Sequence, residues 1–248
     1  MAALVRAARF QLVSRVTRRP VITRFGAATM HVHIGNTAAT KVIYGAPPDW
    51  KEMMAWERLL GPGDLFVDVG ANVGTYSLWA ASSGARVKAV EPDVKALERL
   101  RANVELNPTF DVEVIAAALS DHEGTVEFTK GLDACNQIGH GCVVQSLTLD
   151  AMLDGGHARG VKVDVEGFEQ LVLAGATNVL TDHRVDVFQL EWNGASRSAV
   201  GADRRPVAEI LREAGYAFHR PDLEGRLTTC DPKGFGDDVF AVSPEANI

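Results

Sequence analysis

The sequence is poor in cysteine, and the cysteines present form no recognisable pattern. Only three occur among 248 residues. Cys135, Cys142 and Cys230 include no CxxC pair and no spacing typical of a zinc site, and their number is odd. We therefore expect free thiols in a reducing, cytoplasmic compartment, and no disulfide framework or cysteine-bound zinc.

The chain also lacks an excess of basic residues and lacks long apolar runs. Its 25 Lys and Arg against 32 Asp and Glu give a formal net charge of -7. A general nucleic-acid-binding protein would need a basic face to meet phosphates, so no nucleic-acid partner is expected. Arginines interrupt the apolar residues of the first twenty positions, which argues against a transmembrane segment or a signal peptide there.

Residues 1–19 are rich in arginine and contain no acid. Their apolar residues recur at helical spacing, which predicts an amphipathic helix that ends before Pro20. Two roles are open for it. It can pack on the following domain with a solvated basic edge, or it can make peripheral contact with an anionic membrane or a partner. With the apolar stretch "WKEMMAWERLL" it could also support a homodimer.

From Leu65 onward, short apolar runs alternate with longer helix-like segments, which predicts a parallel sheet covered by helices. We divide the chain into an N-terminal helical or cap-like extension, 1–60, and one domain, 61–248. Residues 120–149 fit the alternation poorly and are predicted to be an insertion, a candidate lid or substrate wall. The predicted strands are 65–69, 86–90, 112–118, 161–165, 186–191, 216–219 and 238–242, and the predicted helices are 75–82, 94–106, 170–174 and 206–213.

The stretch "DLFVDVGANVGTYSLWA" joins the first of these strands to its helix. Asp68, Gly70, Asn72 and Gly74 form the turn, where glycines allow positive φ and close approach of a ligand. A pyrophosphate would be repelled by the carboxylate of Asp68, by about 1–4 kcal/mol at moderate dielectric. A ligand that carries an ammonium or a sulfonium suits the turn better. The turn therefore predicts S-adenosylmethionine as the cofactor in preference to NAD.

The ends of the next two strands extend this predicted cofactor site. Glu91 closes the second strand, where an acid can accept hydrogen bonds from both ribose hydroxyls, and Pro92 ends that strand. Ala118 and Leu119 lie at the end of the third predicted strand. From this position alone, we expect them to lie beside the adenine of the cofactor.

Several spaced motifs resemble the FkbM-type family of S-adenosylmethionine-dependent methyltransferases. They are "GDLFVDVGANVGTYSLWAA", "AVEPD", "AALSDHEGTVEF", "SLTLDAML" and "VKVDVEGFEQLVLAGA". The resemblance covers about Gly61 to Trp192. It implies the Rossmann-like class I methyltransferase fold, a doubly wound, mostly parallel sheet of seven strands with the last strand antiparallel. It also implies O-methylation, typically of a hydroxyl on a sugar or a polyketide-type small molecule.

A second set of acids follows the fourth and fifth strands. Asp164 and Glu191 should converge because neighbouring parallel strands lie ~4.8 Å apart. Three interpretations are open for the pair: hydrogen bonds to the acceptor or to the methionine end of the cofactor, ligation of Mg²⁺, or a purely structural role with salt bridges to Lys162 or Arg184. Glu166 and Asn193 are predicted to bind the acceptor.

An alcohol must lose its proton as the methyl group is transferred, so a base or a metal has to assist. Asp164 and Glu191 are the leading candidates, and His140 in the insertion and His219 near a late strand end are alternative bases. The leading hypothesis is therefore an O-methyltransferase acting on a small-molecule hydroxyl acceptor. A noncatalytic cofactor-binding member and an NAD-dependent oxidoreductase are the alternatives.

Overall fold

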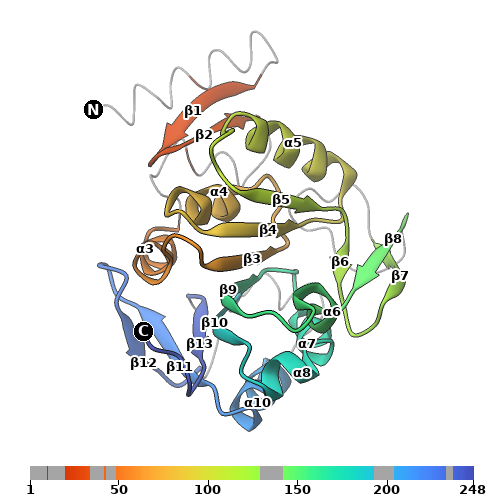
Figure 1. Ribbon diagram of the computed structural model, residues 1–248, viewed down its shortest axis with the longest axis vertical. Helices are drawn as coiled ribbons and strands as arrows, with labels where there is room; N and C mark the ends of the chain where they lie inside the picture. The colour runs from red at the N-terminus through yellow and green to blue at the C-terminus, as the bar shows by residue number, and fades with distance from the viewer. Residues whose placement is uncertain are drawn as a thin grey trace.

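A computed structural model describes residues 10, 20–33, 42, 49–128, 142–192, 204–232 and 237–248. The central feature is an eight-stranded sheet in the order β12-β11-β13-β10-β9-β3-β4-β5 (Figure 1). Strands β10, β9, β3, β4 and β5 are parallel to one another, and β13 runs antiparallel to both β10 and β11. The strands are β3 Leu65–Val69, β4 Arg86–Val90, β5 Val112–Ile115, β9 Ala158–Val163, β10 Val185–Leu190, β11 Ala217–Pro221, β12 Leu227–Thr229 and β13 Val239–Val242.

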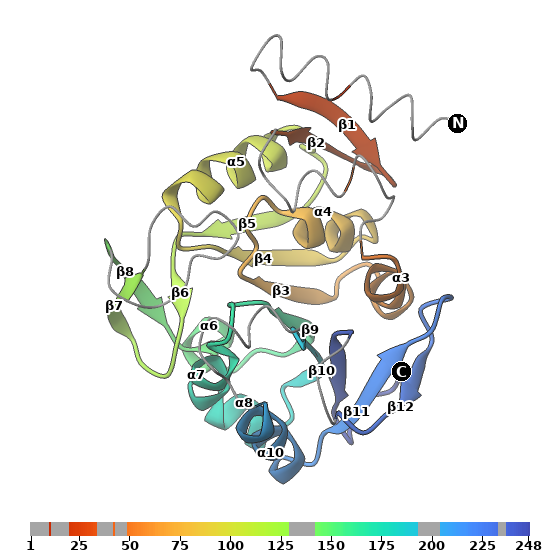
Figure 2. The same cartoon turned by 180° about the vertical axis from the view of Figure 1, so that it is seen from behind.

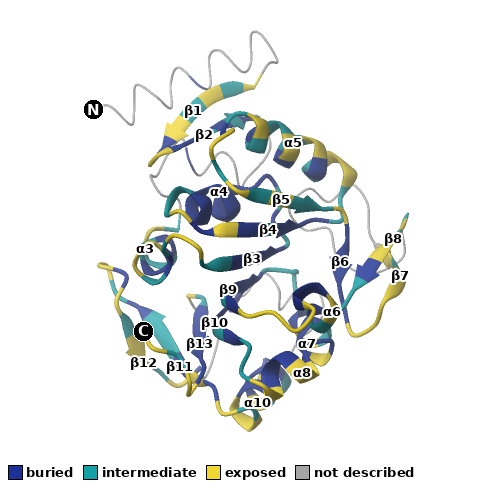
Figure 3. Cartoon of the chain, in the orientation of Figure 1, coloured by how far each residue is buried: buried dark blue, intermediate teal, exposed yellow. Residues whose placement is uncertain are grey.

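Helices cover the sheet on both faces (Figures 1 and 2). One buried apolar cluster joins the sheet to α3 Trp50–Leu59, α4 Thr75–Ser82 and α5 Val94–Glu105. A second cluster joins the opposite face to α6 Leu149–Leu153, α7 Glu169–Ala174, α8 Thr177–Thr181 and α10 Arg205–Glu213. Strands buried on both faces read as nearly continuous apolar runs. The central strands are accordingly buried along most of their length (Figure 3).

Two smaller elements flank this sandwich. An N-terminal hairpin of β1 Val21–Phe25 and β2 Ala28–Val32 lies on α5. Its backbone N–H groups at Thr29 and His31 donate to the side-chain oxygens of Asn107 and Asn103 at 2.9 and 2.7 Å. Beyond β5, the strands β6 Ala118–Leu119, β7 Gly124–Phe128 and β8 Cys142–Leu147 form a separate sheet in the order β6-β8-β7.

The predicted class I fold is confirmed, with seven of its strands in the expected arrangement and β12 added as an eighth strand at the edge. The predicted third strand, 112–118, is wrong in extent. It ends at Ile115, and Ala118–Leu119 pairs with Ser146–Leu147 of the second sheet. Within the predicted insertion, β7 and β8 pair as antiparallel strands. The predicted N-terminal helix lies almost entirely outside the described residues. Among the described residues, no helix is long and apolar enough to cross a membrane.

Candidate active site

The turn between β3 and α4 is built from residues with left-handed backbone conformations. Gly70, Asn72 and Gly74 have φ values of 80°, 51° and 87°. A Cβ at Gly70 would lie 2.0 Å from the carbonyl oxygen of Asp164, and a Cβ at Gly74 would lie 2.5 Å from Leu100 Cδ1. Packing against backbone therefore requires a glycine at position 70, whereas at position 74 the positive φ is the stronger reason for a glycine. The requirement at Gly70 does not depend on the approach of a ligand, which was the reason considered from the sequence.

Glu91 lies at the carboxyl end of β4, beside this turn. It is 6% exposed, and its two carboxylate oxygens accept hydrogen bonds from the N–H groups of Asn72 at 2.7 Å and Asp93 at 2.8 Å. Burial raises the pKa of Glu91 to about 7, although these backbone hydrogen bonds act in the opposite direction. Glu91 is thus hydrogen-bonded to the glycine turn through Asn72. Contact of Glu91 and the adjoining Pro92 with a ribose stays a prediction.

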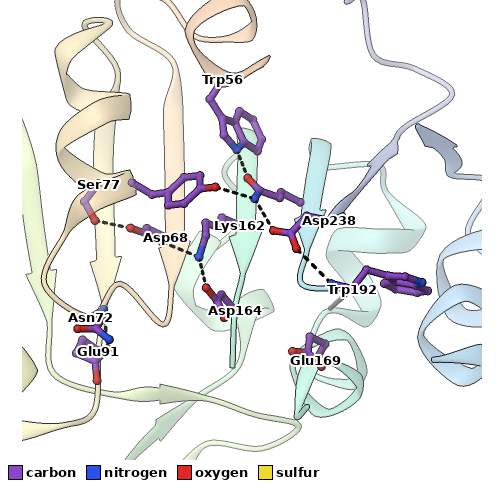
Figure 4. A network of polar contacts seen from close by, with 12 residues as sticks. Trp56, Asp68, Asn72, Ser77, Glu91, Lys162, Asp164, Glu169, Trp192 and Asp238 are labelled. Atoms are coloured by element: carbon purple, nitrogen blue, oxygen red, sulfur yellow. Dashed lines mark hydrogen bonds and ion pairs between the residues drawn. The ribbon is translucent and has the colours of Figure 1, made fainter. Parts of the chain in front are cut away.

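Asp68 lies beneath the turn and is 1% exposed. Its Oδ2 accepts a hydrogen bond from Ser77 Oγ of α4 at 2.6 Å, and its Oδ1 lies 3.9 Å from Lys162 Nζ (Figure 4). Burial raises the pKa of Asp68, while the nearby ammonium of Lys162 and the Ser77 hydroxyl lower it. The sequence led us to expect a carboxylate that faces the ligand directly. The structure instead encloses Asp68 among protein groups.

Several buried polar atoms of the turn make no hydrogen bond with another described residue. They are Asp68 Oδ1, Asn72 Oδ1 and Thr75 Oγ1. Buried polar groups without a partner are uncommon because each costs free energy of desolvation, about 1–3 kcal/mol. Asp68 Oδ1 faces the Lys162 ammonium, whereas Asn72 Oδ1 can only accept a hydrogen bond and Thr75 Oγ1 can donate or accept one. The turn thus has the donor and acceptor character that fits a ligand rich in N–H or O–H groups.

Asp164, Glu166 and Glu191 form a second acidic group at the carboxyl ends of β9 and β10. Each offers an oxygen, and these oxygens all lie within 4.8 Å of one another. Burial, followed by the neighbouring acids, raises the pKa of Glu166 to about 7 and the pKa of Glu191 well above its ordinary value. The predicted convergence of Asp164 and Glu191 is confirmed. At neutral pH this group therefore holds protons as well as negative charge.

The carboxylates of this group are the ligand type that Mg²⁺ prefers. Mg²⁺ holds its ligands at about 2.0–2.1 Å, which places opposite ligands roughly 4.2 Å apart. The three oxygens lie within 4.8 Å of one another, so the bound on their separation is close to this value. In addition, Asp164 Oδ2 accepts a hydrogen bond from Lys162 Nζ at 2.8 Å, so a cation already serves this carboxylate. The salt bridge to Lys162 that the sequence offered as one reading is confirmed, and ligation of Mg²⁺ by Asp164 and Glu191 stays a prediction.

Residues 68–218 match the methyltransferase FkbM domain. The chain belongs to the FkbM methyltransferase family. It is 30% identical over 159 residues to the hexuronic acid methyltransferase AglP of Haloferax volcanii, a match that covers 61% of this chain and 62% of that relative. It is also 40% identical over 76 residues to a ribosomal protein L11 methyltransferase of Bacillus cereus, which covers 29% of this chain and 24% of the relative. The chain thus spans less than two thirds of the length of either relative.

The fold is shared with solved methyltransferases. The magnesium protoporphyrin IX methyltransferase of Synechocystis PCC 6803, solved with bound SAM, superposes with a TM-score of 0.51 and 16% sequence identity, covering 84% of each chain. At this identity the likeness concerns the fold alone. The methyltransferase family and the class I architecture therefore rest on independent comparisons, one of sequence and one of structure.

Polar side chains on three neighbouring strands of this FkbM family member lie side by side, which the sequence alone did not indicate. Asp68, Lys162 and Gln189 are partners in the register of β3, β9 and β10, so they share one face of the sheet. Gln189 accepts from Trp56 Nε1 and donates to Asp238 Oδ2 at 2.9 Å. The detectable signal was a lysine and a glutamine inside the apolar runs "RGVKV" and "VDVFQL".

The remaining predicted site residues are not gathered with these acids. His219 lies on β11, two strands from β10, which corresponds to roughly 10 Å at the usual strand spacing, and its Nδ1 lies 3.1 Å from the carbonyl oxygen of Ala217. Ala118 and Leu119 are buried and pair with Ser146 and Leu147 of β8, and their contact with an adenine stays a prediction. His140 and Asn193 lie outside the described residues. Arg184 pairs with Asp150 and Asp182, so it does not serve as the partner of Asp164 or Glu191.

Proposed function

We propose that this protein is an S-adenosylmethionine-dependent O-methyltransferase that acts on a hydroxyl of a sugar or another polyhydroxylated small molecule, such as a polyketide-type product. The observation that carries the proposal is the pairing of two features at one edge of the sheet. The β3–α4 turn holds buried acceptor atoms without partners, and the acids that follow β9 lie next to it, since Gly70 packs against the Asp164 carbonyl. Family membership supports the methyltransferase chemistry and the cofactor.

The turn residues match the chemistry of this cofactor. S-adenosylmethionine supplies an activated methyl group on a sulfonium when it is bound. Asn72 Oδ1 and the Glu91 carboxylate provide acceptors for N–H and O–H donors. Asp68 contributes from below by fixing Ser77 at the start of α4. These residues bind and orient; the proton of the acceptor hydroxyl is handled elsewhere.

The acids after β9 and β10 are suited to an acceptor that bears several hydroxyls. Glu166 and Glu191 have raised pKa values, so they carry protons that can be donated to hydroxyl oxygens. Asp164, paired with Lys162 and with a side chain 38% exposed, is the group placed to receive the proton of the reacting hydroxyl. The name of AglP, a hexuronic acid methyltransferase, supports a sugar-related acceptor. Alignment of the two reactants can contribute about 7–11 kcal/mol to such a transfer.

Two measurements test the proposal. Calorimetric titration with S-adenosylmethionine and with NAD should show binding of the former only, and Glu91→Ala should weaken it by about 1–3 kcal/mol through loss of charged hydrogen bonds. Release of S-adenosylhomocysteine should then be screened over neutral sugars, uronic acids and polyketide glycosides. Asp164→Asn should suppress turnover and leave cofactor affinity near that of the wild type.

Each outcome has a defined meaning. Tight binding of NAD, or equal cofactor affinity in Glu91→Ala, would refute the placement of the cofactor. Cofactor binding without turnover on any acceptor would favour a noncatalytic member. Loss of turnover on thorough chelation, restored by Mg²⁺, would select the metal alternative for Asp164 and Glu191.

A further inference from the structure

Lys162 is a buried lysine in the middle of a central strand. It is 4% exposed and lies between Val161 and Val163, both of which are 0% exposed. A buried ammonium is costly unless other groups compensate its charge. A strand interior offers no reason of its own to keep a lysine, because an apolar residue of similar length would pack there at lower cost. The partners of the ammonium should therefore explain why it is present.

The groups around the ammonium come from the segment after β9, from the neighbouring strand β3 and from the covering helix α4. Directly after β9, Asp164 Oδ2 accepts a hydrogen bond from Nζ at 2.8 Å. From β3, Asp68 Oδ1 lies 3.9 Å away, and from α4 the Tyr76 ring centroid lies 4.6 Å away (Figure 4). Asp238, just before β13, adds a further negative field. Attraction by these acids outweighs burial and keeps the pKa of Lys162 above its usual range.

The two carboxylates that flank the ammonium belong to different halves of the site. Asp68 lies beneath the turn proposed to hold the cofactor, and it is tied to Ser77. Asp164 belongs to the acidic group proposed to receive the acceptor, with Glu166 and Glu191 within reach. The hydrogen bond from Lys162 restrains the Asp164 carboxylate, and the same ammonium lies 3.9 Å from Asp68 Oδ1 in the cofactor half. Among the described residues, Lys162 is therefore the side chain that links the two carboxylates.

We propose that Lys162 is a positioning residue for methyl transfer, which holds the Asp164 carboxylate in place between the cofactor turn and the acceptor acids. The inference rests on the proposed function and deepens it. Lys162 does not touch the reactants; it acts through Asp164. An error of about 1 Å in the placement of a reacting group can cost on the order of 100-fold in rate.

The first test is structural and needs no acceptor. Crystal structures of Lys162→Met and Lys162→Arg are compared with that of the wild type. The Asp164 carboxylate should leave its wild-type position in Lys162→Met and keep it in Lys162→Arg, which retains a cation. An Asp164 carboxylate in the same place in Lys162→Met would overturn the proposal. If Lys162→Met fails to fold, a Lys162→Arg structure with Asp164 displaced would overturn it instead.

The second test separates positioning from general stability. Lys162→Met should lower kcat by about 100-fold with KM for S-adenosylmethionine within about threefold, and Lys162→Arg should recover most of the loss. The acid limb of the pH–rate profile should move to higher pH in Lys162→Met. The control is Lys88→Met on β4, two strands from β9, where the Lys88 Nζ donates to the Met152 carbonyl at 2.9 Å. Unchanged kcat and an unchanged pH profile in Lys162→Met would overturn the proposal.

The Lys88→Met control and the wild-type protein show whether the Lys162 proposal or the proposed function has failed. An equal loss of kcat in Lys88→Met would show that removal of any strand lysine disturbs the sheet, and would overturn a specific role for Lys162. A wild-type protein that binds no S-adenosylmethionine would refute the proposed function, whatever the structures of the Lys162 variants show.

Discussion

Replacement of Gly70 by alanine tests the packing between the cofactor turn and the segment after β9. Two costs add at this position. The φ of 80° is strained for any residue with a Cβ, by roughly 1–2 kcal/mol. The new Cβ would also lie 2.0 Å from the Asp164 carbonyl oxygen. Relief of that contact requires a shift of about 1 Å, and overpacking of this kind costs about 1–3 kcal/mol.

Gly63 offers a matched control, because it has a φ of 90° and a Cβ there would meet nothing within 4 Å. Gly63→Ala carries the backbone strain alone, so we expect a loss of about 1–2 kcal/mol in the free energy of unfolding, against about 2–5 kcal/mol for Gly70→Ala. Urea denaturation monitored by tryptophan fluorescence measures both. Equal losses in the two variants would show that the turn does not pack against Asp164 as described.

Two further predictions concern buried charge. Burial raises the pKa values of Glu91 and Asp238 to about 7, so the folded protein binds extra protons below that pH and the free energy of unfolding should fall as pH rises from about 5 to 8. The slope of this pH dependence is at most about 1.4 kcal/mol per pH unit for each group. The Asp238→Asn variant should show a smaller slope. Urea denaturation in which the free energy of unfolding rises with pH would contradict the prediction. Arg204→Met removes the ion-pair partner of Glu169, which is 0% exposed. The free energy of unfolding, measured in the same assay, should fall by about 3–5 kcal/mol. A loss below about 1 kcal/mol would show that the pair is not buried as described.

Elements with sharp local signals could be predicted from the sequence. Strand 65–69 and helix 75–82 have the predicted bounds, because the glycines of the turn mark where the apolar run of the strand ends and where the helix begins. The strand predicted at 112–118 is too long for the opposite reason. The run "VIAAAL" stays apolar across the point where the chain leaves one sheet and enters another, so composition gives no sign of the break.

The site was predictable to the extent that strand ends define it. Asp164 and Glu191 follow neighbouring strands, and their convergence needs no knowledge of long-range packing. The contact of Gly70 with the Asp164 carbonyl is different, because it depends on the depth at which two distant segments meet. The orientation of Asp68 could not be predicted either. In a strand buried on both faces, alternation does not reveal which side faces a ligand.

The charge of the site is smaller than a count of its acids indicates. Glu91 and Glu166 have pKa values raised to about 7, and that of Glu191 is raised further. Asp164 is balanced by Lys162. From the sequence we expected the negative charge of the site to repel a pyrophosphate. Near neutral pH this repulsion is therefore a weaker basis for ligand selection than the pattern of hydrogen-bond donors and acceptors. Because Asn72 Oδ1 can only accept, it selects for N–H and O–H groups whatever the protonation of the neighbouring acids.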